Sequence, residues 1–167
     1  MKEYSFTNDV LPLKDKLYRL ALRITLQTDE AEDIVQETLI RVWEHRTEWP
    51  ELQSIEAYSL TICRRLALDA ANRAGRGNVQ LMEHDAQSLL QTAEAQDARE
   101  RMALVRQLMD SLPEVQRSIM ELRDIEGYSY QEIADVLQLS DSQVKVYLHR
   151  ARTTLRQLVE KTERYGL

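Results

Sequence analysis

The chain has 167 residues, of which 43% are apolar and 30% are charged, and its formal net charge is −6. These proportions are typical of a soluble globular protein and exclude a largely disordered one. A single cysteine, Cys63, excludes an internal disulfide and a multi-cysteine zinc site. No apolar run approaches the roughly 18 residues that cross a bilayer, and the N-terminus lacks the apolar core of a signal peptide. We therefore expect a cytoplasmic protein without membrane insertion.

Helices are favoured throughout, because only four glycines and three prolines interrupt a sequence rich in Leu, Ala, Glu, Gln and Arg. Apolar residues at three- and four-residue spacing predict a first helix over 10–27. The stretch "TDEAEDIVQETLIRVWEHR" predicts a second helix, with Thr28 or Asp29 as its cap. One side of this helix is apolar, and the other is an acidic stripe of Glu30, Asp33, Glu37 and Glu44. A third predicted helix begins at Ser54 and runs to about Asn72.

The pattern changes after residue 74. The stretch "AGRGNVQLMEHDAQSLLQTAEA" has two glycines, no clear period and an acidic bias. A loop within one domain is the alternative, but a loop of about 20 residues without structure would be unusual there. We therefore predict two small all-α domains, over 1–75 and 94–167, joined by a flexible linker over 76–93.

The second half has one long helical pattern, over 94–110, followed by three helix-start signals. Each signal is a serine followed three residues later by Glu or Gln, the spacing of a capping box. The pairs are Ser111 and Glu114, Ser129 and Glu132, and Ser140 and Gln143. Three such signals within about 30 residues predict short helices joined by tight turns.

Two of these short helices have facing apolar stripes, which predicts a helix-turn-helix. The first stripe contains Ile133, Ala134 and Leu137, and the second contains Val144, Leu148 and Ala151. Burial of the second stripe would turn a polar and basic face outward, comprising Ser142, Gln143, Lys145, Val146, His149, Arg150 and Arg152. Such a helix fits a DNA major groove, where Gln and Arg bind base edges and Lys and Arg bind phosphates. The alternative is an ordinary solvated face near a helix C-terminus.

Two long segments resemble a known family. The segment "EVQRSIMELRDIEGYSYQEIADVLQLSDSQVKVYLHRARTTLRQL" resembles region 4 of sigma factors of the extracytoplasmic-function (ECF) type. The segments "LYRLALRITLQTDEAEDIVQETLIRVWEHRTEW" and "IEAYSLTICRRLALDAANR" resemble region 2 of the same family. The resemblance implies that the chain binds core RNA polymerase and directs it to promoters. The second domain would read the −35 element as duplex, and the first would read and open the −10 element as a single strand.

The resemblance also assigns residues to these contacts. Ser142, Gln143, Lys145, Val146, His149 and Arg150 match the −35 positions, and the outward face adds Arg152. The loop over 46–54 and the third helix match the −10 reader, giving Arg46, Trp49, Arg64, Arg65 and Arg73. Trp49 would stack on an unpaired base, or else plug the junction between helix and loop. Arg64 and Arg65 would follow strand phosphates, or else form one salt bridge and one solvated charge.

The acidic helix matches the surface that docks on a basic helical pair of the polymerase clamp in this family. The matching residues are Asp33, Gln36, Glu37 and Ile40. Carboxylates that face arginines give orientation and fast association, although a stripe of this kind is in most proteins only a solvated helix face. The family also has anti-sigma factors that occlude such surfaces, so an anti-sigma factor is an expected partner.

Some positions depart from the family pattern. The turn has Gln138 where glycine is frequent, and the recognition helix begins with Ser142 and Gln143 where many relatives have Gly-Thr. At Arg64 many relatives carry Asn. The fold should survive these changes, but neither promoter element can be assigned a sequence by analogy.

Two other functions are compatible with parts of the sequence. A helix-turn-helix regulator that acts without polymerase would leave the first domain and its acidic helix unexplained. An all-helical adaptor that binds only protein would leave the basic face unexplained. No catalytic residues or cofactor are expected, because the sequence has no metal-spaced His/Cys set and no phosphate-binding glycine loop. The acidic net charge further predicts that the free protein binds DNA weakly and that polymerase must hold it there.

Overall fold

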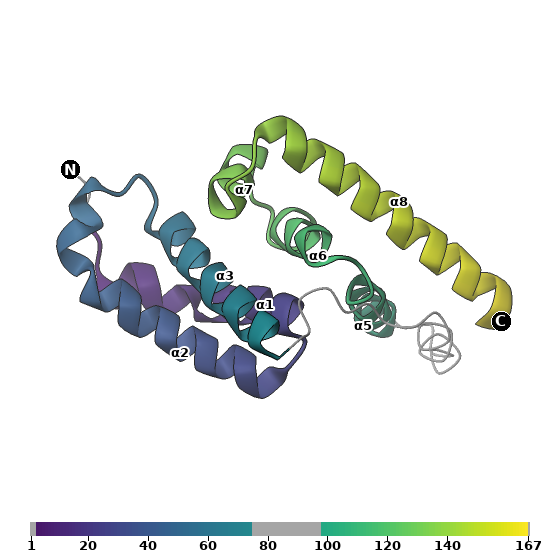
Figure 1. Cartoon of the computed structure of the whole chain (residues 1–167), viewed down its shortest axis with the longest axis horizontal. Coiled ribbons are helices and arrows are strands. Elements are labelled where there is room, and N and C mark those ends of the chain that lie inside the picture. Colours follow the sequence, from purple (N-terminus) through teal and green to yellow (C-terminus); the bar gives the residue numbers. More distant parts are fainter. Residues whose placement is uncertain (1–2, 75–97, 167) are drawn as a thin grey trace.

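The computed structural model describes residues 3–74 and 98–166, and within these ranges every element is helical and no strand occurs (Figure 1). The predicted linker over 76–93, and the first residues of the helix expected over 94–110, lie outside the described residues. The all-α fold class is confirmed.

Three helices of the N-terminal half pack against one another. The elements are η1 (Phe6–Val10), η2 (Leu11–Leu13), α1 (Lys14–Thr25), α2 (Thr28–Glu44), η3 (Arg46–Glu51) and α3 (Ile55–Arg73). Leu17, Leu20 and Ile24 of α1 are fully buried, as their spacing predicted. The first α-helix is shorter than expected, because a π-helical turn and a 3-10 turn replace its predicted first residues. The predicted cap of α2 is wrong, because the N-cap is Gln27 and not Thr28 or Asp29, and Gln27 makes no side-chain capping bond.

The C-terminal half is a set of short helices along one long helix. The elements are α5 (Ala98–Met109), α6 (Glu114–Met120), η4 (Glu121–Ile125), α7 (Tyr130–Leu137) and α8 (Asp141–Gly166). The long helix α8 contacts α5, α6 and α7 (Figure 1). Short helices are marginal alone, so this packing rather than helix propensity stabilises them.

Two of the three predicted capping boxes are present. The Ser129 hydroxyl accepts a bond from the Glu132 backbone N–H at 3.1 Å, and the Glu132 carboxylate accepts one from the Ser129 N–H at 3.2 Å. Ser140 and Gln143 make the same reciprocal pair, at 2.9 and 3.1 Å. Between these boxes, Gln138 ends α7 in the left-handed conformation, with φ of 57°. The turn therefore forms without the glycine that is frequent there.

The third box, predicted at Ser111 and Glu114, is wrong. Pro113 is the N-cap of α6, and the Ser111 hydroxyl donates instead to the Leu108 carbonyl at 2.7 Å. The Glu114 carboxylate accepts from Ser118 within the same helix at 2.9 Å. The side chains of the motif are present, but each binds a different partner.

The two halves pack against each other, which the sequence left open. Helix α3 lies against α7, and α1 lies against α6 and η4 (Figure 1). Buried apolar side chains from both halves form one continuous cluster. A smaller cluster of Val10, Val42, Trp49 and Ile55 lies beneath the loop that precedes α3.

Candidate nucleic-acid interface

The helix-turn-helix is built by α7, the turn at Gln138 and the first turns of α8. Val144, Leu148 and Ala151 of α8 are at most 2% exposed. The apolar stripe of α7 is buried as well, with Ile133 fully enclosed. Because these two apolar stripes are buried, the opposite face of α8 points outward, and the predicted orientation of the helix is confirmed.

All seven residues predicted to read the −35 element are exposed on α8. They are Ser142, Gln143, Lys145, Val146, His149, Arg150 and Arg152. Val146 is 47% exposed, so its methyl groups are available for a contact with a thymine methyl. A polar and cationic face with one apolar residue has the composition that base edges and phosphates require.

Two cations of this face are already held by neighbours. Arg152 forms a two-pronged ion pair with Asp124, with Nε at 3.1 Å from Oδ2. The Lys145 ammonium lies 5.7 Å from the centre of the Tyr130 ring. These contacts position the side chains, and a phosphate at Arg152 must share the guanidinium with Asp124 or displace that carboxylate.

One of the predicted −10 residues, Trp49, is buried. Trp49 is only 6% exposed, and its indole Nε1 donates to the Val42 carbonyl at 3.0 Å. In this conformation Trp49 plugs the junction between α2 and the loop, which was the alternative interpretation. Arg46 is exposed, with its guanidinium 4.4 Å from the centre of the Trp43 ring.

Trp43 is the aromatic residue that sequence reasoning missed here. It is 46% exposed at the end of α2, and the edge-on rings of Phe6 and Trp49 lie 5.5 and 6.1 Å from it. The available signal was helical spacing, because Trp43 lies three residues beyond Ile40 on the exposed face of the acidic helix.

The arginines of α3 differ in their surroundings. Arg65 and Arg73 are exposed. Arg64 is half-buried and its guanidinium lies 3.2 Å from the Glu114 carboxylate of α6. The salt bridge predicted as the alternative for one arginine of this pair is therefore present at Arg64.

The acidic face of α2 is exposed, and within it the Glu37 carboxylate accepts a hydrogen bond from Arg41 Nε at 3.1 Å. Asp33, Gln36, Glu37 and Ile40 are exposed, and Ile40 is 50% exposed. The opposite face of α2, which includes Val35 and Val42, is buried against the core. An apolar side chain among carboxylates is suited to docking on a basic protein surface.

The comparisons with known proteins agree on one family. The Sigma-70 region 2 family matches residues 10–77, and the Sigma-70 region 4 family matches residues 102–155. The ECF RNA polymerase sigma factor SigL of Mycobacterium tuberculosis is 31% identical over 147 residues, covering 84% of this chain and 80% of SigL. The chain belongs to the ECF RNA polymerase sigma factors.

Further relatives differ in length. SigE of Mycolicibacterium smegmatis is 32% identical over 155 residues, which cover 88% of this sigma factor but only 58% of SigE. EcfG of Rhodopseudomonas palustris is 27% identical over 164 residues, covering 97% of this chain and 90% of EcfG.

Two solved structures share the fold. RpoE of Bartonella quintana, solved in complex with the anti-sigma factor NepR, has a TM-score of 0.68 and 20% identity and covers 93% of this chain and 96% of its own. CnrH, solved in complex with the cytosolic domain of CnrY, has a TM-score of 0.64 and 20% identity and covers 91% and 85%. At this identity the likeness concerns the fold alone.

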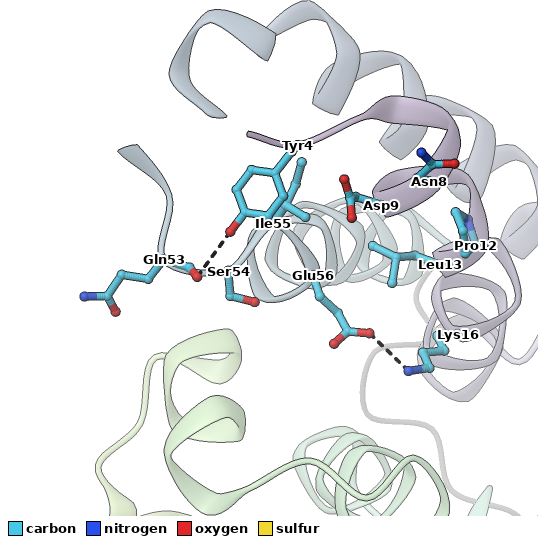
Figure 2. A pocket seen from close by; sticks show the side chains of 10 residues that line it. All are labelled: Tyr4, Asn8, Asp9, Pro12, Leu13, Lys16, Gln53, Ser54, Ile55 and Glu56. Atoms are coloured by element: carbon cyan, nitrogen blue, oxygen red, sulfur yellow. Dashed lines mark hydrogen bonds and ion pairs between the residues drawn. The ribbon is translucent and has the colours of Figure 1, made fainter. Parts of the chain in front are cut away.

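A cleft of about 450 Å³ with a mixed polar and apolar lining lies in this sigma factor beside the start of α3. Figure 2 shows the Tyr4 hydroxyl at the Gln53 carbonyl, 3.2 Å away, and the Lys16 ammonium paired with Glu56 at 3.1 Å. The first bond fastens the N-terminal segment to the end of the loop that precedes α3, and the second links α1 to the first turn of α3. Because Asp9, Lys16 and Glu56 bring both signs of charge, the cleft selects no ligand class.

Over residues 3–74 and 98–166, no three His, Cys, Asp or Glu side chains gather to hold a metal ion. Burial raises the pKa of the Cys63 thiol to about 12, so the thiol is protonated at neutral pH. Among the helices that the structure describes, none has the length and apolarity to cross a membrane.

Proposed function

We propose that this ECF sigma factor binds core RNA polymerase and directs it to promoters in the cytoplasm, as a DNA-binding regulator and not an enzyme. Helix α8 reads the −35 duplex through its outward face. Arg46, Arg64, Arg65 and Arg73 contact the −10 strand, and the exposed stripe of α2 docks on the polymerase. The observation that carries this proposal is the burial of Val144, Leu148 and Ala151 on α8, because it determines which face of the helix can contact DNA.

The polymerase surface is supported by charge and exposure. Asp33, Glu37 and Ile40 share one exposed face of α2, whereas a regulator that works without polymerase has no use for such a stripe. Because RpoE of Bartonella quintana and CnrH were solved bound to NepR and CnrY, we also propose an anti-sigma partner for this chain.

Transcription reconstituted with core polymerase on a library of random promoters tests the proposal. We expect run-off transcripts that share two sequence elements, and we expect them to disappear when Arg150 is changed to Ala. Gln157→Ala, on an exposed position of the same helix, is the matched control. DNA binding of equal affinity with and without polymerase would instead support the stand-alone regulator.

Pull-down of core polymerase tests the α2 surface separately. Glu37→Arg should abolish capture, because it places a cation against a basic clamp surface. Asp15→Arg makes the same charge change on the exposed side of α1 and should leave capture intact. Equal capture by both variants would reject the α2 surface.

A further inference from the structure

The side-chain amide of Gln143 is oriented by the start of helix α8. The Ser140 backbone N–H donates to Gln143 Oε1 at 2.9 Å, and the Ser140 hydroxyl accepts from the Gln143 backbone N–H at 3.1 Å. Because a backbone N–H can only donate, the amide atom that faces it is the oxygen. The residue is exposed, so the Nε2 group, with its two N–H bonds, is the end of the amide that a ligand can use.

A glutamine held in this way recognises a hydrogen-bond acceptor. In the usual contact of glutamine with DNA, the amide oxygen accepts from adenine N6 while the amide nitrogen donates to adenine N7. The capping bond competes for that oxygen, and turning the amide fully toward adenine gives up a bond that closes the first turn of α8. The contact that preserves the capping box is a single donation from Nε2. Its acceptors in the major groove are thymine O4, guanine O6 and the purine N7 atoms.

Val146 favours one of these acceptors over the others. It lies three residues after Gln143, so the two side chains are neighbours on the surface of one helix. Both are exposed. Thymine is the base whose major-groove edge has an acceptor, O4, beside a methyl group on C5. A donor next to an apolar side chain complements that edge, whereas guanine and adenine have no methyl group for Val146 to contact.

The nearby cations of α8 are placed for a different task. Lys145 lies 5.7 Å from the ring centre of Tyr130 in α7, and Arg152 is paired with Asp124 in η4. These two cations therefore lie on the edge of the outward face that is nearest to α7 and η4. Cations at such an edge suit phosphates, and phosphate contacts position a helix in the groove without reading sequence.

We propose that Gln143 and Val146 together read one thymine of the −35 element. Gln143 donates from Nε2 to thymine O4, and Val146 packs on the C5-methyl group. The inference rests on the proposed function, because it names the base that α8 selects in the duplex. The two roles of Gln143 are compatible, since its oxygen caps the helix while its nitrogen contacts the base.

Promoters selected from a random library by core polymerase carrying this sigma factor test the donor. Glu in place of Gln143 still accepts from the Ser140 N–H, so the capping box stays, but a carboxylate cannot donate. Promoters selected with Gln143→Glu should carry cytosine in place of thymine at one −35 position, because cytosine N4 is a donor where thymine O4 is an acceptor. Gln157→Glu makes the same charge change at an exposed position of α8 and should leave the selected element unchanged.

Base substitutions at that position separate the two contacts. Deoxyuridine keeps O4 and lacks the methyl group, so the original holoenzyme should bind it about three- to fivefold more weakly than thymine. The Val146→Ser holoenzyme should bind thymine and deoxyuridine equally. Cytosine presents a donor, and the original holoenzyme should bind it about tenfold more weakly than deoxyuridine. Each comparison is a ratio within one variant, so a general change in charge or folding cancels.

Three results would overturn the inference. Preference of the original holoenzyme for adenine would show that the amide makes the bidentate contact, and an equal loss for all bases in Gln143→Glu would place Gln143 at a phosphate. Equal binding of thymine and deoxyuridine by the original holoenzyme would exclude the methyl contact. If no polymerase-dependent promoter is selected, the proposed function fails instead, and the same comparisons on duplexes selected by the full chain alone at low salt still decide whether Gln143 and Val146 read thymine.

Discussion

Gln138 offers a direct test of how the helix-turn-helix is stabilised. It ends α7 with φ of 57°, in the left-handed region where a side chain crowds the following carbonyl. The residue is exposed, and its backbone N–H closes the helix on the Ala134 carbonyl. Glycine would keep that backbone bond and remove the crowding, so we expect Gln138→Gly to stabilise the protein.

The size of the effect follows from two opposing contributions. Relief of the left-handed conformation is worth about 1 to 2 kcal/mol. Glycine also gains freedom in the unfolded chain, which costs roughly 0.5 to 1 kcal/mol. The net gain in the free energy of unfolding should be about 0.5 to 1 kcal/mol, a rise in Tm of about 1 to 4 °C for a chain of this size.

Urea denaturation followed by circular dichroism measures this gain, and the m-value should not change. The matched control is Gln131→Gly, the same substitution at an exposed position within α7, where φ is helical. There glycine should destabilise the protein by about 1 kcal/mol. Two changes of the same sign would refute the assignment of strain to Gln138.

Four further substitutions probe the packing. Leu148→Ala should lower the free energy of unfolding by about 2 to 5 kcal/mol in urea denaturation, because the side chain is 2% exposed, whereas exposed Val146→Ala should change it by less than about 0.5 kcal/mol. Burial raises the pKa of Glu121, so its contribution to stability is fullest below its usual pKa and is lost as pH rises through the folded-state pKa. The free energy of unfolding of the Glu121→Gln variant, relative to that of the original protein, should therefore be higher at pH 7 than at pH 4. Urea denaturation at both pH values checks the sign. Trp49→Phe removes the hydrogen bond to the Val42 carbonyl and should lower the free energy of unfolding by about 0.5 to 1.5 kcal/mol. A loss of single-strand binding without a loss of stability would show that Trp49 stacks on a base instead.

The orientation of α8 could be predicted because it depends on local spacing. Val144, Leu148 and Ala151 recur on one side of a helix, and any helix that buries them must expose Lys145 and Arg150. The capping boxes at Ser129 and Ser140 are local in the same sense. The assignment of the exposed residues to promoter elements stays a prediction, because solvent exposure alone does not identify a ligand.

The failed capping box has a cause that sequence spacing cannot contain. Glu114 lies three residues after Ser111, but its carboxylate lies beside Arg64, 50 residues earlier in the chain. Pro113 occupies the N-cap position in place of the serine. A local motif was therefore overridden by a contact between regions.

The packing of region 2 against region 4 also could not be predicted from the sequence. Arg23 and Arg117 are charged residues of the kind that lies at the surface of most proteins, yet they are 8% and 0% exposed. Their partners are backbone carbonyls and distant carboxylates, which leave no periodic signal. Only the three-dimensional arrangement shows that these arginines join the two regions.

We expect two features of the chain to oppose DNA binding by the free protein, and salt distinguishes them. The net charge of −6 repels phosphates over distance, but at 0.1 M salt such repulsion is screened beyond about 10 Å. The contact between Arg64 and Glu114 is largely shielded from solvent, with side chains 16% and 8% exposed, so salt weakens it much less. Near physiological ionic strength we therefore expect the contact between Arg64 and Glu114 to restrain DNA binding by Arg64 more than net charge does. Removing exposed acidic residues should then raise DNA affinity mainly at low salt, whereas freeing Arg64 should raise it at physiological salt as well.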